Sequence, residues 1–167
     1  MLEKYIDKNF KLFFFFLIVC FIVYFPAIDG EFLLDDEQFI QKNTFVHQLN
    51  IKSIYTTSVT EGAKMSGNFY RPNQQFIYSL IYNLFGEKST VPFHIANILF
   101  HALNGFLLFL LLMRLQFKRA YAIIGGLLFI MHPILSESVA FISGRLSAIV
   151  SHLLVVKLSL QIFIGKF

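Results

Sequence analysis

The chain has 167 residues, of which 56% are hydrophobic, 22 are phenylalanine and none is tryptophan. Its mean hydropathy of +0.65 is higher than a soluble domain of this length needs to fill a core, so the sequence predicts an all-α integral membrane protein. The net charge of +4 is typical of basic cytoplasmic helix ends and excludes nucleic-acid binding. The single cysteine, Cys20, excludes a disulfide framework and a cysteine metal cluster within one chain.

The first predicted membrane span covers residues 12–28, an uncharged run that extends roughly 25 Å as a helix. Lys4, Lys8 and Lys11 precede it, so the positive-inside rule places the N-terminus in the cytoplasm. A cleaved signal peptide is the alternative. The residues after Pro26 offer no small-x-small cleavage site, so we expect an anchor that stays in the membrane.

Residues 29–90 form a connection that is too long for a turn and too apolar for a free linker. We expect this extracytoplasmic loop to fold on the membrane surface. Pro72, the apolar stripe that follows it and Gly86 predict an interfacial amphipathic helix. A shorter interfacial helix is predicted over residues 50–57, where three apolar side chains share one side.

Three adjacent acidic residues, Asp35, Asp36 and Glu37, follow the point where the chain leaves the first span. Neighbouring carboxylates repel one another, so such a cluster is either a solvated loop or a site that uses its charge. The motifs farther along the chain favour a site.

The second predicted span, residues 91–113, carries His94, Asn97, His101 and Asn104 at steps of 3, 4 and 3. On a helix these four side chains lie within an arc of about 80°. A polar stripe in lipid faces protein or water, which leaves two interpretations open. The stripe either hydrogen-bonds to neighbouring helices or forms one wall of a polar cavity.

The loop after the second span is basic, with Arg114, Lys118 and Arg119 and no acidic residue nearby, so it is placed in the cytoplasm. The third predicted span, residues 120–135, is short because His132-Pro133 interrupts it. A fourth is predicted over residues 146–164, although it contains a lysine. A lysine inside a terminal membrane helix is ordinary for a truncated protein, so we expect a fragment.

His132, Glu137 and Arg145 belong to the segment H-P-I-L-S-E-S-V-A-F-I-S-G-R after the third span. This segment lies near membrane depth in the predicted topology. An acid and an arginine there should be paired or line a wet cleft.

Four motifs stand in a fixed order along the chain: F-L-L-D-D-E-Q-F-I-Q-K-N, S-G-N-F-Y-R-P-N-Q, F-H-I-A-N-I-L-F-H-A-L-N and the H-P-I-L-S-E-S-V-A-F-I-S-G-R segment. Together they resemble the N-terminal part of GT-C class membrane glycosyltransferases. The resemblance is greatest to the protein O-mannosyltransferase relatives that carry tetratricopeptide repeats, and it covers most of residues 25–145.

The resemblance implies transfer of a sugar, mannose in this family, from a polyprenyl-phosphate carrier to a protein hydroxyl or glycan acceptor on the extracytoplasmic face. It implies that Asp35 or Asp36 is the catalytic carboxylate. A hydroxyl that attacks an anomeric carbon needs a carboxylate within hydrogen-bond reach, and the departing phosphate needs a cation. The resemblance assigns no certain cofactor, and a divalent cation is an alternative partner for the phosphate. The candidate substrate-binding residues are Arg71, His94, His101, His132, Glu137 and Arg145.

The sequence departs from the family where Ser147 stands in place of an acidic residue, and the likeness fades after about residue 151. We therefore expect a truncated remnant of a glycosyltransferase, inactive if four spans leave the groove for the carrier lipid incomplete. The alternative function is a non-catalytic membrane bundle that acts as an interaction or assembly subunit, which needs only the predicted topology and a hydrogen-bonded stripe. Haem or metal binding by His94 and His101 is a third, but it needs a facing histidine and only His152 is available on another predicted span. Composition favours a bacterial inner membrane.

Overall fold

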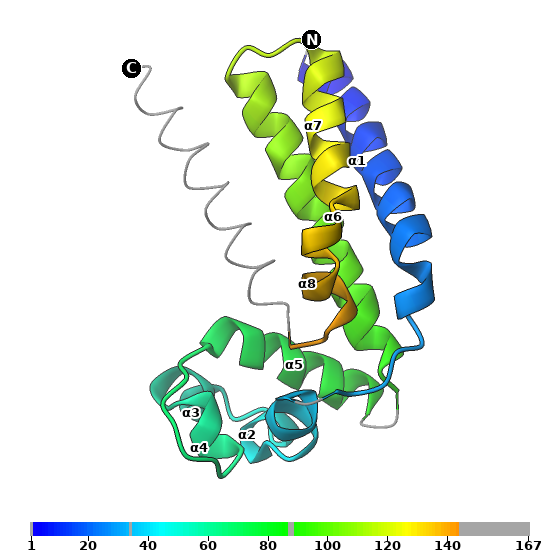
Figure 1. The fold of residues 1–167 in the computed structure, drawn as a ribbon. Helices are drawn as coiled ribbons and strands as arrows, with labels where there is room; N and C mark the ends of the chain where they lie inside the picture. Colours follow the sequence, from blue (N-terminus) through cyan, green and yellow to red (C-terminus); the bar gives the residue numbers. More distant parts are fainter. Residues whose placement is uncertain (1, 34, 87–88, 144–167) are drawn as a thin grey trace.

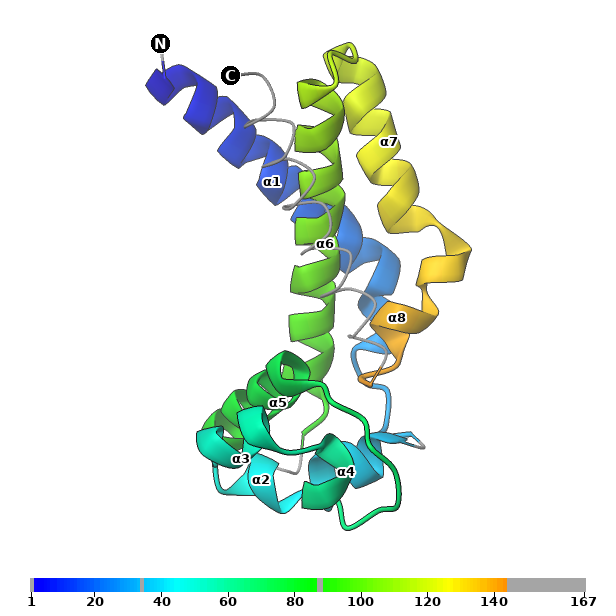
Figure 2. The same ribbon diagram turned by 90° about the vertical axis from the view of Figure 1, so that its left-hand side faces the viewer.

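The computed structural model describes residues 2–33, 35–86 and 89–143, and within them every regular element is a helix. The three longest are α1 (Leu2–Tyr24), α6 (Val91–Arg114) and α7 (Arg119–Met131). They lie side by side in a bundle, with α7 antiparallel to α6 (Figure 1). The view turned by 90° shows α1 crossing α6 (Figure 2).

Two helices of the bundle are long and apolar enough to cross a membrane, by length and composition, at Phe10–Ala27 and Val91–Arg114. Both coincide with predicted spans. The helix of the third predicted span is α7, which ends at Met131 because Pro133 has no N–H to continue it. A 3₁₀ turn, η3 (Pro133–Leu135), follows. The fourth predicted span lies outside the described residues.

The bundle packs through glycine as well as through large side chains. A Cβ on Gly126 would lie 2.5 Å from the ring of Phe16 and 2.8 Å from the carbonyl oxygen of Gly105. The backbones of α6 and α7 therefore approach as closely as small residues allow in helix pairs. The buried core around this contact comprises Phe16, Cys20, Tyr24, Ile98, Ala102, Phe109, Ala122, Ile130 and Val139.

The second region gathers at the end of the bundle where α6 begins (Figures 1 and 2). It contains a π-helical turn, η2 (Glu37–Gln41), and three short helices, α2 (Thr44–His47), α3 (Ile51–Thr56) and α4 (Val59–Gly62). The longer α5 (Pro72–Phe85) covers them. We call this the end region. Its α3 and α5 occupy the two segments where the sequence predicts helices, and their position at the membrane surface stays a prediction.

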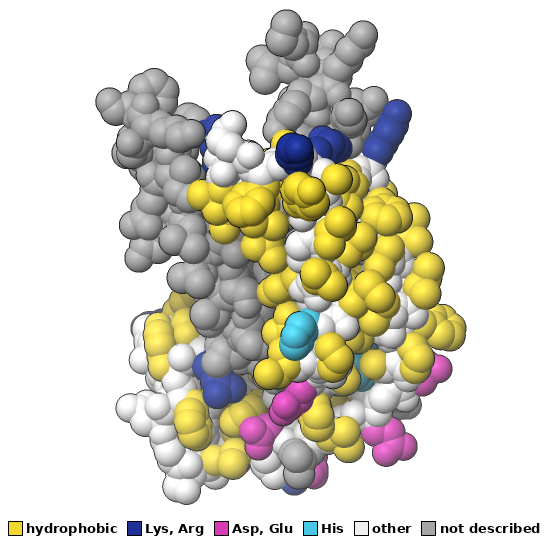
Figure 3. Space-filling view, turned by 45° about the horizontal axis from the view of Figure 1, so that its top comes forward, with side chains coloured by type: hydrophobic (Ala, Val, Ile, Leu, Met, Phe, Trp, Pro, Cys, Tyr) yellow, Lys and Arg dark blue, Asp and Glu magenta, His cyan; other side chains and the backbone are white. Residues whose placement is uncertain are grey.

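The loop between α6 and α7 is basic and has no acidic residue, whereas the end region carries acidic side chains as well as basic ones, among them Lys42, Lys52, Lys64 and Arg71. On the face in Figure 3, most basic side chains gather at one end, acidic side chains gather toward the other, and apolar surface lies between them. The basic end carries the α6–α7 loop, and the acidic end carries the end region. A short basic loop of this kind is what the positive-inside rule places in the cytoplasm.

After α7 the chain turns back toward the end region through η3 and a single helical turn, α8 (Glu137–Ala140) (Figure 2). Val139 then packs into the bundle core, while Ile142 packs into the core of the end region with Ile40, Tyr78 and Phe93. Residues 139–143 therefore join the two hydrophobic cores.

Candidate functional site

The two aspartates at the start of η2 have different environments. Asp36 is 1% exposed. Its Oδ1 accepts a hydrogen bond from the backbone N–H of Ser143 at 2.7 Å, and its Oδ2 accepts one from Leu33 at 3.2 Å. Asp35 is exposed, and no hydrogen bond or ion pair joins its carboxylate to the described residues. The two adjacent carboxylates therefore differ in environment: that of Asp36 is bound to backbone N–H groups, and that of Asp35 is open to solvent.

The π-helical turn that follows Asp36 departs from regular α-helix. The Lys42 N–H bonds the Glu37 carbonyl at 2.9 Å, which is the i→i+5 pattern. π-helical turns are rare in proteins, and those that occur are often found at functional sites. An ion pair between Lys42 Nζ and Glu37 at 2.7 Å spans the same turn, but both side chains are about half exposed, so it adds little stability.

Three further side chains hold the segment that Asp36 contacts. Gln74 Nε2 donates to the Ser143 carbonyl at 2.9 Å, and the Tyr78 hydroxyl donates to the Ile142 carbonyl at 2.8 Å. Asn97 Nδ2 donates to the carbonyls of Val139 at 3.2 Å and Phe141 at 3.0 Å. Asp36 directly precedes η2, Gln74 and Tyr78 lie on α5, and Asn97 lies on α6. Residues from the first three sequence motifs therefore meet residues 139–143 of the fourth.

The histidines of the α6 stripe also bind backbone. His94 Nε2 lies 3.1 Å from the Gly30 carbonyl oxygen in the chain that leaves α1. His101 Nε2 lies 3.2 Å from the carbonyl oxygen of Ile130, which also accepts from the Tyr24 hydroxyl at 2.9 Å. That carbonyl lacks a helical partner because α7 ends at Met131, just before Pro133. These contacts match the interpretation of the stripe as a set of hydrogen bonds to neighbouring elements.

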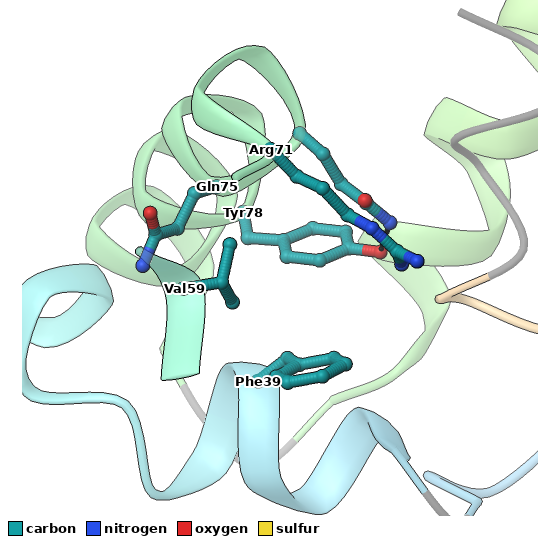
Figure 4. A pocket seen from close by; sticks show the side chains of 6 residues that line it. Phe39, Val59, Arg71, Gln75 and Tyr78 are labelled. Carbon is teal, nitrogen blue, oxygen red and sulfur yellow. Dashed lines mark hydrogen bonds between the residues drawn. The ribbon is translucent and has the colours of Figure 1, made fainter. Parts of the chain in front are cut away.

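Arg71 lies at the start of α5, partly buried, with its guanidinium carbon 5.6 Å from the ring centre of Phe69. It lines a cleft with Phe39, Val59 and Tyr78 that contains about 190 Å³ of empty space, part of it open to solvent (Figure 4). In Figure 4 the Arg71 guanidinium lies on the same side as the Tyr78 hydroxyl, toward the Ser143 segment.

The other candidate residues are dispersed. His132 and Glu137 are exposed, and His132 Nδ1 accepts from the Ile134 N–H at 3.3 Å, which caps η3. Arg145 lies outside the described residues. Within those residues, no group of three or more His, Cys, Asp or Glu side chains is arranged to hold a metal ion.

Sequence reasoning did not single out Gln74, Tyr78 or Ser143. Gln74 closes the S-G-N-F-Y-R-P-N-Q motif, and Ser143 precedes the Gly-Arg pair of the fourth motif, so motif membership was the available signal. Tyr78 lies one helical turn after Gln74, which places the two on one face of α5.

Comparison with known proteins agrees with the motifs. The chain is 31% identical over 152 residues to the protein O-mannosyl-transferase TMTC3 of Mus musculus, covering 87% of this chain and 16% of that protein. It is 30% identical over 135 residues to a protein O-mannosyl-transferase of Caenorhabditis elegans, covering 74% of this chain and 19% of that protein. A third relative, the human protein O-mannosyl-transferase TMTC4, is 29% identical and covers 77% of this chain.

No family model and no solved structure matches the chain. The chain spans less than a fifth of the length of the curated relatives named above. These relatives are animal proteins, and the bacterial inner membrane stays a prediction. The resemblance that the four motifs indicated is confirmed: over most of its length, this chain is similar to protein O-mannosyl-transferases.

Proposed function

We propose that the chain is part of a GT-C type membrane glycosyltransferase domain that moves a sugar, mannose by analogy with its relatives, from a polyprenyl-phosphate carrier to a protein hydroxyl or glycan acceptor. The observation that carries the proposal is the meeting of all four motifs at residues 139–143. A functional site is expected to bring together motifs that lie far apart in sequence, and here side chains from three motifs hydrogen-bond to one short backbone segment of the fourth. The names of the relatives supply the reaction class.

Asp35 is the carboxylate we assign to the acceptor. It is exposed, and it lies next to a residue whose two oxygens are bound to backbone. In that position it can accept the proton of an attacking hydroxyl, which gains nucleophilicity as the bond to the anomeric carbon forms. Asp36 is 1% exposed and each of its oxygens accepts a backbone N–H, so an attacking hydroxyl meets Asp35 first.

The departing polyprenyl phosphate carries negative charge that a cation must stabilise. Arg71 is a partly buried arginine at the start of α5, and its guanidinium lies on the same side of the cleft as the Tyr78 hydroxyl. We assign Arg71 and Arg145 to the phosphate, with a divalent cation as the alternative. His132 and Glu137, which are exposed, complete the proposed substrate set, whereas His94 and His101 are buried and would reach a substrate only by giving up their bonds to Gly30 and Ile130.

The proposed topology has four spans, over residues 12–28, 91–113, 120–135 and 146–164, with the N-terminus in the cytoplasm. It is supported by the two membrane-length helices and by the basic loop between α6 and α7. The end region then lies on the extracytoplasmic surface, with α5 at the interface, where the lipid-linked donor presents its sugar.

The test is transfer of labelled mannose from polyprenyl-phosphate-mannose to protein acceptors, in membranes that contain the chain. We expect transfer from the unmutated chain and a decrease of about 100-fold or more in Asp35→Asn, as for loss of a general base. Arg71→Gln should also lower the rate. Glu61→Gln removes the same charge from an exposed site on α4 and should leave the rate unchanged.

Two outcomes would contradict the proposal. The first is no transfer by the unmutated chain when protease protection shows that it is inserted. The second is equal transfer by the unmutated chain and Asp35→Asn. Either outcome would favour the alternative of a non-catalytic membrane bundle, in which the polar side chains of α6 serve only to join its elements.

A further inference from the structure

We infer that Asp36, Gln74, Tyr78 and Asn97 form a positioning clamp: they hold the backbone of residues 139–143 against the Asp35 side of the site and do not touch substrate. The contacts stand on geometry alone, and the effect on turnover rests on the function proposed above. We call these four side chains the clamp.

The clamp provides hydrogen-bond partners for backbone groups that do not belong to a helix or a sheet. Past α8, residues 141–143 are in neither a helix nor a sheet, so their backbone groups have no ladder to join. Such groups must find other partners when water is excluded. The carbonyls of residues 139, 141, 142 and 143 accept from Asn97, Tyr78 and Gln74. The N–H of residue 143 donates to Asp36.

The clamp residues are buried and already engaged. Asp36, Gln74, Tyr78 and Asn97 are exposed by 1%, 4%, 2% and 0%. Gln74 Nε2 bonds both the Tyr78 hydroxyl and the Ser143 carbonyl, which uses both of its N–H groups. Asp36 uses one oxygen for each of two backbone N–H groups. Because all four side chains are nearly fully buried, a sugar, a phosphate or an acceptor would reach them only if the surrounding chain moved.

The clamp fixes the first motif against the fourth. Asp36 is adjacent to Asp35, and its partner Ser143 lies 107 positions away in sequence. Loss of the Asp36 bond would let the two motifs move relative to each other. A displacement of about 1 Å in a catalytic group typically costs about 100-fold in rate.

Thiol labelling tests the clamp without any activity. Ile142→Cys places a thiol at a position that is 0% exposed, and native Cys20, also 0% exposed, reports whether the bundle stays folded. The chain in detergent is treated with N-ethylmaleimide, and each labelled thiol is identified by mass spectrometry. Asp36→Asn replaces one carboxylate oxygen with an N–H₂ group, so the two backbone donors can no longer both be accepted. Asp35→Asn loses the same charge one residue away and is the matched control.

We expect the introduced thiol to be labelled at least tenfold faster with Asp36→Asn than with Asp35→Asn, while Cys20 stays protected in both. Equal labelling of the introduced thiol in the two variants would overturn the clamp. If Cys20 becomes reactive with Asp36→Asn, the bundle has unfolded, and Tyr78→Phe replaces that variant in the test. It removes only the hydroxyl that bonds the Ile142 carbonyl, and unchanged labelling of the introduced thiol there would also overturn the clamp.

Turnover per inserted molecule separates positioning from catalysis. With Asp36→Asn we expect turnover to fall about 100-fold while the acidic limb of the pH–rate profile remains, because Asp35 is still the base. With Asp35→Asn the acidic limb should be absent from the pH–rate profile of the residual activity. Faster labelling of the introduced thiol with normal turnover would overturn the positioning role. No transfer by the unmutated chain would refute the proposed function and leave the labelling result standing.

Discussion

The bundle and the end region are stabilised in different ways. In the bundle, α1, α6 and α7 meet through phenylalanine, isoleucine and small residues, with Gly105 and Gly126 at the closest approach. In the end region, short helices are tied to one another by buried side chains that bond backbone groups, among them Asn43 with Val59 and Ser79 with Val46. Residues 139–143 belong to both, because Val139 and Ile142 lie in different cores.

This difference predicts which kinds of amino-acid substitution each region tolerates. Apolar packing is non-directional and is lost in proportion to the contacts removed, whereas a buried polar bond fails when one partner is changed. Substitutions in the bundle should therefore act through volume, and substitutions in the end region through single atoms.

The largest expected effect is in the bundle. Gly126→Ala places a methyl group 2.5 Å from a Phe16 ring atom and 2.8 Å from the Gly105 carbonyl oxygen, which cannot rotate away. We expect a loss of about 3 kcal/mol, as for overpacking, seen as a lower thermal midpoint in detergent. At Gly125 a Cβ would meet only the terminal Cδ1 of Leu112, at 2.6 Å, so Gly125→Ala should be near neutral. Equal midpoints for the two variants would contradict this packing.

Next is the join between the regions. Asn97→Leu keeps the approximate size of a fully buried side chain but leaves the carbonyls of Val139 and Phe141 without that donor. Unpaired buried polar groups cost about 1–3 kcal/mol each, so we expect a loss of about 2 kcal/mol. Limited proteolysis should then cut after residue 135 before it cuts within α6. Cleavage at the wild-type rate would show that Asn97 does not hold this segment.

A smaller effect is expected within the end region. Asn43 caps α2 by accepting from Phe45 at 3.0 Å, and it also donates to the Val59 carbonyl at 3.1 Å. Asn50 caps α3 through the Ser53 N–H alone, at 3.1 Å. Loss of a cap costs about 0.5–2 kcal/mol, so Asn43→Ala should cost about 1.5 kcal/mol and Asn50→Ala about half of that. Chemical denaturation of the two variants measures the difference, and a reversed order would be inconsistent with the Val59 bond.

The smallest effect on stability is expected at the apolar end of α5, where Leu84 is 74% exposed. The chain has no tryptophan, so Leu84→Trp introduces a single fluorescent probe. If this face of α5 lies at the membrane interface, its emission should be blue-shifted and quenched by brominated lipid. Met65→Trp, in the turn after α4, is the control and should emit as in water. Identical spectra at the two sites would count against an interfacial α5.

The sequence predicts much of the bundle and less of the end region. Helices α1 and α6 follow from long apolar runs, and the limits of α5 follow from Pro72 and Gly86, which are local signals. The π-helical turn and the burial of Asp36 could not be predicted, because they depend on a partner 107 positions away that leaves no periodic pattern. The sequence predicts that the polar residues of α6 lie on one face of the helix. It does not predict what they contact, because the carbonyl groups of Gly30 and Ile130 have no sequence signature.

The most direct test of the join between the two regions is amide hydrogen exchange, followed by mass spectrometry, for peptides that cover residues 139–143. We expect these amides to exchange as slowly as those of the end-region helix α5, and we expect Asp36→Asn to speed their exchange while leaving α6 protected. Exchange of this segment in the unmutated chain at the rate of the exposed turn at residues 64–69 would contradict the claim that the two regions are joined there.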